Sequence, residues 1–309
     1  MNVSAVAAAK NTEITAKESF EQTVIDTLEK WLPGDTKFQI KKIMKPNDRV
    51  LDGLIISDEQ TDVAPTIYLD PYYDAFVAGG ASFDEIIENI FRLYKDNRTE
   101  TGFDQDAFLN WDRAKEKITY RLLNRKANEK FLEDVPFVPY LDLAVVFTYL
   151  LTIDDAGQGS IVIHKCHAEN WGVDDDELYE AAKKNTARLL PVEYKPMSDM
   201  LEDLMPGSGE ELTDGIPDML VLSNKTRTYG AAAILYKDVL HDIAEKMDCD
   251  LWILPSSVHE VLLLPKEGDR NIFTDLSAMV REVNATQVPE GEILSDHAYL
   301  YTRDGEFKF

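Results

Sequence analysis

The residues best suited to chemistry in this sequence lie in one short segment, 255–260. It holds the hydroxyls of Ser256 and Ser257, the imidazole of His259 and the carboxylate of Glu260. A serine becomes a nucleophile when a neighbouring imidazole takes its proton. The interpretation that we favour is structural: the hydroxyls cap a turn, and the other two side chains bond to nearby backbone. No nucleophile elbow surrounds the serines, and a zinc-protease helix would need a second histidine.

A second group of reactive side chains is His164, Cys166 and His167, three potential metal ligands within four residues. We predict a strand over 160–167, which places His164 and Cys166 on one face and His167 on the other. Zinc requires four ligands, usually in two separated pairs, and Cys249 has no ligand beside it. We therefore expect an ordinary strand with a buried cysteine here, and neither a metal nor another cofactor.

A third candidate site is a basic segment. Arg113, Lys117 and Arg121 recur at intervals of four within a stretch, Asp106 to about Asn128, that we predict to be one long helix. Such a stripe suits a phosphate, an acidic partner or a nucleic-acid backbone. The alternative is a solvated helix face that pairs with acidic neighbours elsewhere in the fold.

Composition limits the partners of the chain. Its 309 residues include 57 acidic and 32 basic side chains, which gives a formal charge of −25. This charge repels nucleic acid and anionic lipid, so we expect no general nucleic-acid binding and no membrane association. No apolar stretch approaches the ~20 residues that a membrane span needs. With two cysteines and no basic residue before the apolar segment 3–9, we predict a cytoplasmic protein without a signal peptide.

The elements that must position these residues follow from periodicity and capping. Strand pairs followed by helices recur three times, over 37–95, 140–189 and 250–284, and neither a P-loop nor a dinucleotide-binding fingerprint occurs. This order favours an α+β fold with mixed or antiparallel sheets, built from repeated hairpin-plus-helix units with helices packed on one side.

The expected domain organisation depends on one clear linker. Residues 206–217 read Pro-Gly-Ser-Gly-Glu-Glu-Leu-Thr-Asp-Gly-Ile-Pro, a composition typical of a connection. We predict a disordered tail over 1–14, an α+β part over 15–205, and a second α+β part over 218–309 that packs against the first.

Several strings of residues resemble a known family. They are PTIYLD at 65–70, YGAAAIL at 229–235 and PSSVHEVLLLP at 255–265. Together they resemble a family of uncharacterised proteins from anaerobic gut bacteria, known as a domain of unknown function, over about residues 18–302. The resemblance implies no assigned activity. Because members occur beside mobile-element genes, it hints at an interaction between host and element.

Two functions remain open from the sequence. The first is a non-catalytic cytoplasmic binding protein, whose acidic surface or basic helix engages an unidentified macromolecular partner. The alternative is a hydrolase-type enzyme at the 255–260 hairpin, with Asn224 and Tyr229 on a nearby connection. If this hairpin and the basic segment shared one groove, the two hypotheses would merge into a site for an anionic substrate.

Overall fold

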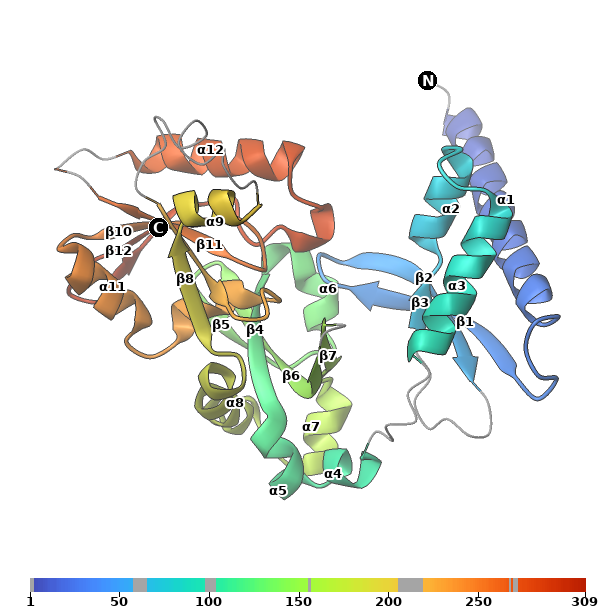
Figure 1. Ribbon diagram of the computed structural model, residues 1–309, viewed down its shortest axis with the longest axis horizontal. Helices are drawn as coiled ribbons and strands as arrows, with labels where there is room; N and C mark the ends of the chain where they lie inside the picture. The colour runs from blue at the N-terminus through green and yellow to red at the C-terminus, as the bar shows by residue number, and fades with distance from the viewer. Residues whose placement is uncertain are drawn as a thin grey trace. The chain divides into compact units, whose positions relative to one another are not determined.

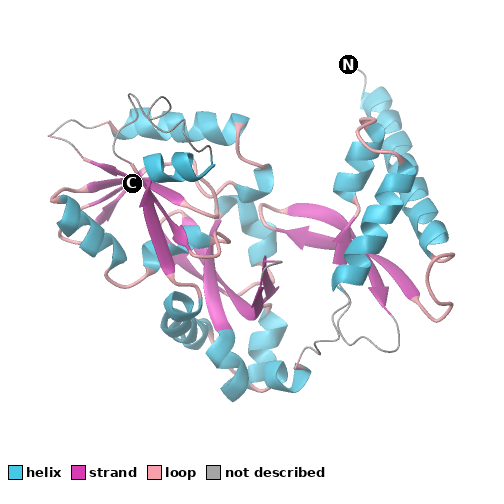
Figure 2. Cartoon of the chain, in the orientation of Figure 1, coloured by secondary structure: helices cyan, strands magenta, loops and turns pink. Residues whose placement is uncertain are grey.

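The computed structural model describes residues 3–57, 66–97, 104–154, 157–204, 219–266, 268 and 272–309 (Figure 1). The contacts within the chain divide it into two compact units. One comprises residues up to Lys45 and Arg49–Asp104, and the other comprises the turn Pro46–Asp48 and Gln105–Phe309. Each unit combines helices with antiparallel strands (Figure 2).

The first unit is a three-stranded sheet covered by helices. A capping box starts one of them, because Ser82 and Glu85 bond to each other's backbone N–H. That helix buries Ile86, Ile90 and Tyr94 in an apolar cluster shared with the sheet. The strands lie in the order β1-β2-β3. The elements are α1 (Val3–Leu28), β1 (Lys37–Lys45), β2 (Arg49–Ser57), β3 (Thr66–Tyr68), α2 (Asp70–Val77) and α3 (Phe83–Asn97).

Within the second unit, one sheet is organised around the long strand β6 (Leu143–Asp154). It pairs with β4 along one edge, and with β5 and then β7 along the other. Its residues from Leu143 to Tyr149 are buried, as expected for a central strand with both faces covered. The neighbouring elements are α4 (Gln105–Leu109), α5 (Trp111–Ala114), η1 (Lys115–Lys117), β4 (Ile118–Asn124), η2 (Lys126–Asn128), α6 (Glu129–Leu132), β5 (Phe137–Tyr140), β7 (Gly157–Val162), α7 (Lys165–Trp171) and α8 (Asp175–Leu189).

The other sheet of this unit has six strands in the order β13-β12-β10-β11-β9-β8. The helix α12 packs Leu276 and Val280 against Trp252 of this sheet. The strands of this sheet and the helices around it are β8 (Val192–Pro196), α9 (Met197–Leu204), β9 (Leu220–Asn224), η3 (Gly230–Leu235), α11 (Val239–Met247), β10 (Leu251–Pro255), β11 (Val261–Pro265), α12 (Phe273–Thr286), η4 (Glu290–Glu292), β12 (Tyr299–Tyr301) and β13 (Phe307–Lys308).

The expected α+β class with mixed or antiparallel sheets is confirmed, and every described strand pair is antiparallel. The compact units, however, divide the chain near residue 104, not near 206–217. Strand β8 precedes that predicted linker and pairs with β9 beyond it. The linker itself lies outside the described residues. The tail expected over residues 1–14 is helical from Val3 onward, as the start of α1.

The long helix predicted over 106–128 is wrong. The side chain of Asn110 caps a new short helix, α5, and β4 then pairs with β6 over all seven of its residues. Its sequence, Ile-Thr-Tyr-Arg-Leu-Leu-Asn, begins with β-branched and aromatic residues that favour a strand. Farther along the chain, Asp238 has a φ of 65° and separates η3 from α11.

None of the described helices is both long and apolar enough to cross a membrane.

Candidate binding site

The turn that joins β10 to β11 uses its serines structurally. The backbone N–H groups of Ser256 and Ser257 both donate to the carbonyl of Glu260, at 3.3 and 3.2 Å. The Ser257 hydroxyl accepts a hydrogen bond from the N–H of His259, at 3.0 Å. This is the local side chain-to-backbone bonding that hydroxyl residues make in turns, which is the structural interpretation favoured from the sequence.

His259 is held by backbone and by an aromatic neighbour. Its Nδ1 accepts a hydrogen bond from the N–H of Tyr229 at 3.1 Å, and the two rings lie 5.5 Å apart with an angle of 36° between them. A neutral imidazole that accepts at Nδ1 carries its proton on Nε2. That nitrogen lies 3.8 Å from a carboxylate oxygen of Glu292. The basic nitrogen of this histidine is therefore occupied by a backbone donor.

Asn224 shapes the loop that leads to Tyr229. It is buried; its amide donates to the carbonyl of Thr228, while its side-chain oxygen accepts from Thr226 and from the Thr228 N–H. The loop ends with Tyr229 in a left-handed conformation, φ 52° and ψ 31°. Such a conformation is uncommon for a residue other than glycine and is maintained by its surroundings. Asn224 is thus a structural residue of the loop.

Gly230 lets this loop and the β10–β11 turn approach each other closely. A Cβ atom at this position would lie 2.1 Å from Ser223 Oγ and 2.7 Å from the carbonyl oxygen of His259. The same Ser223 hydroxyl donates to that carbonyl, at 2.8 Å. Loop and turn therefore form one packed substructure, which brings His259 and Tyr229 together although they are distant in sequence.

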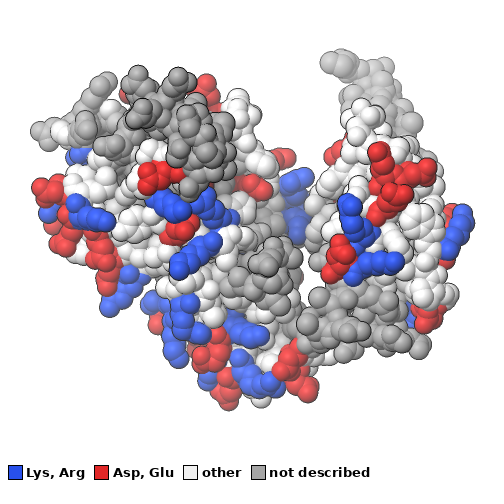
Figure 3. Space-filling model, in the orientation of Figure 1, with Lys and Arg blue, Asp and Glu red and all other residues white. Residues whose placement is uncertain are grey.

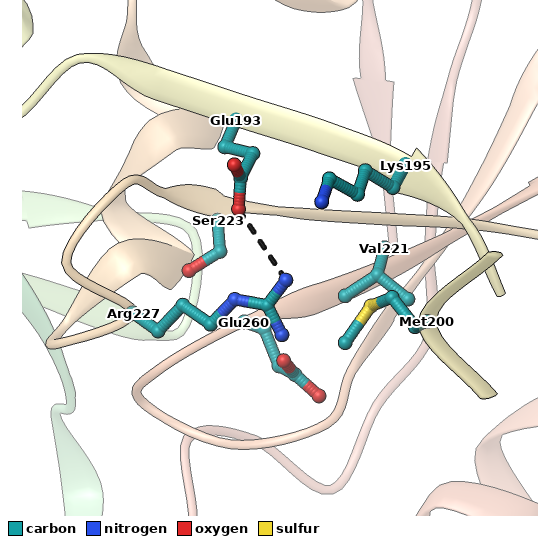
Figure 4. A pocket seen from close by; sticks show the side chains of 7 residues that line it. All are labelled: Glu193, Lys195, Met200, Val221, Ser223, Arg227 and Glu260. Atoms are coloured by element: carbon teal, nitrogen blue, oxygen red, sulfur yellow. Dashed lines mark hydrogen bonds and ion pairs between the residues drawn. The ribbon is translucent and has the colours of Figure 1, made fainter. Parts of the chain in front are cut away.

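A small pocket opens beside this substructure, on one face of strands β8 and β9 (Figure 4). Its volume is about 190 Å³, including the part open to solvent. In this view the guanidinium of Arg227 lies between the carboxylates of Glu193 and Glu260, and a distance of 3.3 Å separates it from Glu193. The residues that line the pocket are Glu193, Lys195, Met200, Val221, Ser223, Arg227 and Glu260.

The pairing of β8 with β9 explains the pocket walls. Glu193 lies opposite Ser223, and Lys195 opposite Val221, so these four side chains share one face of the sheet. The sequence analysis identified Glu260 but none of the other residues of the pocket. Four of these become neighbours only through this pairing, and Met200 and Arg227 come from α9 and the loop after β9. Arg227 had one local signal, its position in a loop between a strand and a Gly-Ala-rich turn.

The three basic residues predicted to form a stripe are separated. Arg113 is exposed on α5, and the Lys117 ammonium lies 5.5 Å from the centre of the Tyr149 ring. Arg121 is only 5% exposed on β4, and its guanidinium lies 4.4 Å from the centre of the Tyr229 ring. Burial lowers the pKa of Arg121 below its ordinary value, an effect that the neighbouring Tyr229 opposes. Of the predicted stripe, Arg121 therefore lies near the 255–260 hairpin, through Tyr229, whereas Arg113 and Lys117 do not contribute to this site.

The His-Lys-Cys-His segment caps a helix instead of lying on a strand. Strand β7 ends at Val162, and α7 begins at Lys165, with the N–H of His164 donating to Nδ1 of His167 at 3.1 Å. The His164 ring bonds to the carboxylate of Asp134, at 2.7 Å. Cys166 is exposed, contrary to expectation, because the helix turns it to the surface. Over the described ranges, no three His, Cys, Asp or Glu side chains are grouped so as to hold a metal ion.

The first unit contains a charged cluster that the sequence did not reveal. Lys17 on α1 bonds to the carboxylates of Asp52 and Asp70, and Lys42 on β1 bonds to Asp52 at 3.0 Å. Burial alone would raise the pKa of Asp52, but the two ammonium groups outweigh it and lower that pKa. Glu21 lies beside them, 8% exposed. Burial, with a smaller contribution from Asp52, raises the pKa of Glu21 to about 7.

Together, these features define an α+β protein of antiparallel sheets that carries a small charged pocket. Comparison with protein families assigns the chain to one of them. The model of DUF5688, a family of unknown function, matches residues 17–303, and the chain belongs to this family. The resemblance to an uncharacterised family is thereby confirmed. No curated protein and no solved structure matches the chain.

Proposed function

We propose that this protein is a non-catalytic binding protein that receives a lysine or arginine side chain of a macromolecular partner in the pocket beside β8 and β9. The observation that carries the proposal is the carboxylate of Glu260. It lines the pocket, yet it forms no hydrogen bond or ion pair with any residue in the described part of the chain. A partly buried carboxylate without a partner favours a cationic guest.

The other charges of the pocket are already engaged. Arg227 pairs with Glu193, and Lys195 has a partner as well. A carboxylate guest would therefore compete with existing contacts, while a cationic guest would complete a contact that Glu260 lacks. Charge matching in a partly desolvated site contributes specificity more than it contributes raw affinity.

The shape of the pocket suits a long side chain. Met200 and Val221 provide an apolar wall, against which the aliphatic part of a lysine or arginine can pack. The hydroxyl of Ser223 donates to the His259 carbonyl and retains lone pairs for a donor from the guest. The volume of about 190 Å³ includes space open to solvent, so the pocket can take no more than the end of one side chain.

The net charge supports the same class of partner. At −25 the protein attracts basic partners at long range. On the face drawn in Figure 3, however, acidic and basic side chains are interspersed over the described residues. General charge attraction on this face therefore distinguishes poorly between basic partners, and a defined pocket can provide that specificity.

The hydrolase alternative requires a serine whose proton the imidazole can take. Ser257 instead caps the turn, and Nδ1 of His259 accepts from the backbone of Tyr229. Since no described hydroxyl bonds to this ring, the geometry favours binding over catalysis. A cytoplasmic location and a link to mobile elements stay predictions, and the proposal depends on neither.

The proposal is tested with a labelled peptide of alternating lysine and glycine, titrated by fluorescence anisotropy. We expect Glu260→Gln to weaken binding about tenfold, which corresponds to one charge-assisted hydrogen bond. The matched control is Glu282→Gln on α12, which removes the same charge from an exposed position. An equal loss of affinity in both variants, or no loss in either, would show that general charge attraction alone binds the peptide.

A further inference from the structure

Arg121 is the most unusual polar side chain in the described part of the chain. It is 5% exposed, and its Nε is enclosed without a hydrogen-bond partner. Among the described residues, none accepts a hydrogen bond from its guanidinium, and no carboxylate lies within ion-pair distance of it. The guanidinium carbon lies 4.4 Å from the centre of the Tyr229 ring.

This arrangement is energetically unfavourable for a structural arginine. A guanidinium stays charged in proteins and has five N–H donors, and an unpaired charge is costly to remove from water. A stacked aromatic ring returns only part of that cost, since a cation–π contact is weaker than the hydration that a full charge loses on burial. In the absence of another role, an apolar residue would fill this position on β4 at a lower cost.

The ring that covers Arg121 is held in place by contacts that can be broken. Tyr229 is half-buried and has a left-handed backbone, and its N–H donates to His259. The His259 ring, itself partly exposed, lies 5.5 Å from the Tyr229 ring. The guanidinium of Arg121 thus packs against the side chain of a loop, and that loop is held by a neighbouring turn.

We propose that Arg121 is the anchor of an oxyanion-binding site that the side chain of Tyr229 covers. A carboxylate or phosphate group accepts two parallel hydrogen bonds from a guanidinium and supplies the charge that Arg121 lacks. The site is distinct from the pocket of Glu260, because Arg121 does not line that pocket. It therefore goes beyond the proposed function and depends on a different observation.

The test measures binding of inorganic phosphate, and separately of acetate, to the full-length chain by calorimetry at constant ionic strength with chloride as the balancing anion. We expect Arg121→Met to abolish binding and Tyr229→Ala, which uncovers the guanidinium, to strengthen it several-fold. Arg113→Met, at an exposed position on α5, is the matched control and should leave binding unchanged. Preference for phosphate over acetate, or the reverse, identifies the source of the oxyanion.

Urea unfolding in chloride buffer adds a measurement that does not depend on the ligand. An arginine retained for binding should not be needed for folding, so Arg121→Met should unfold at the same or a higher urea concentration than the wild type. The proposal is overturned if that variant unfolds at a clearly lower concentration or fails to fold, because Arg121 is then structural. Undiminished anion binding by the variant, or no binding by the wild type, overturns it too.

Discussion

At the scale of single residues, the charged cluster around Lys17 balances two ammonium groups against three carboxylates. Lys17 and Lys42 neutralise Asp52 and Asp70, so Glu21 is the carboxyl group without a cation of its own. One oxygen of Glu21 is enclosed and lacks a partner. Its pKa is raised to about 7 by burial and then by Asp52, which means that the folded chain favours its protonated form.

Because the folded chain raises the pKa of Glu21, the contribution of this residue to the free energy of unfolding falls as the pH rises. Glu21 has a pKa of about 7 in the folded chain, against 4.5 as its ordinary value. Its stabilising contribution is complete below pH 4.5 and is lost as the pH passes 7. We expect Glu21→Gln, which imitates the protonated form, to raise the free energy of unfolding at pH 8 by about 2 kcal/mol. At pH 5 the difference should be small.

Urea unfolding at pH 5 and pH 8 checks this prediction. Glu18→Gln removes an exposed carboxylate from the same helix and is the matched control, with little change expected at either pH. If Glu21→Gln were less stable than the wild type at pH 8, the carboxylate would be making a favourable contact, and the prediction would be wrong.

At the scale of elements, the β9–η3 loop shows how one small residue sets a site. Gly230 is buried where a Cβ would meet two backbone atoms, Asn224 N at 2.6 Å and the His259 carbonyl oxygen at 2.7 Å. Backbone atoms cannot rotate away as the end of a flexible side chain can. The close contact of this loop with the β10–β11 turn therefore requires glycine.

We expect Gly230→Ala to lower the free energy of unfolding by about 2–3 kcal/mol, at the upper end of the cost of overpacking a core. Gly34→Ala is the control, because a Cβ added there would meet nothing within 4 Å beyond its chain neighbours. Chemical denaturation of both variants measures the difference. Equal stabilities would mean that the loop can move away from the turn without cost.

At the scale of the whole molecule, residues that lie far apart along the chain share one sheet. Strand β8 at 192–196 pairs over five residues with β9 at 220–224, and β9 pairs with β11. The two parts expected on either side of 206–217 are therefore linked by backbone hydrogen bonds. The hydrogen bonds between β8 and β9 do not include the connection itself, so we expect the strands to stay paired when that connection is cut.

Co-expression of residues 1–210 and 211–309 as separate chains tests this arrangement. We expect the two fragments to co-purify through a tag on one of them, since β8 remains paired with β9. Leu222→Pro, in the middle of β9, should abolish co-purification because proline cannot donate to the sheet. Independent elution of the unmodified fragments would contradict the pairing.

Elements with strong local signals agree with prediction. The strand-pair-plus-helix unit predicted over 37–95 contains the hairpin of β1 and β2 and the helix α3, and both depend on residues close in sequence. The segment from Ile118 to Asn124 does not agree with prediction. Basic residues at intervals of four predicted a helix there. The segment instead forms a strand because it pairs with β6, and this pairing buries Arg121. Local periodicity contains no information on a partner strand 25 residues away.

Amino-acid sequence by itself determined the α+β class and the strongly acidic charge, because each follows from composition or from the order of local signals, and it left the sheets as mixed or antiparallel. Only the tertiary structure decided which charged side chains are left without a hydrogen-bond or ion-pair partner. Glu260 comes near the Arg227–Glu193 pair only because β9 pairs with both β11 and β8, and Arg121 contacts Tyr229 only where a loop lies against β4. Burial and proximity are properties of the packed chain, and they turn an ordinary charged side chain into a candidate site.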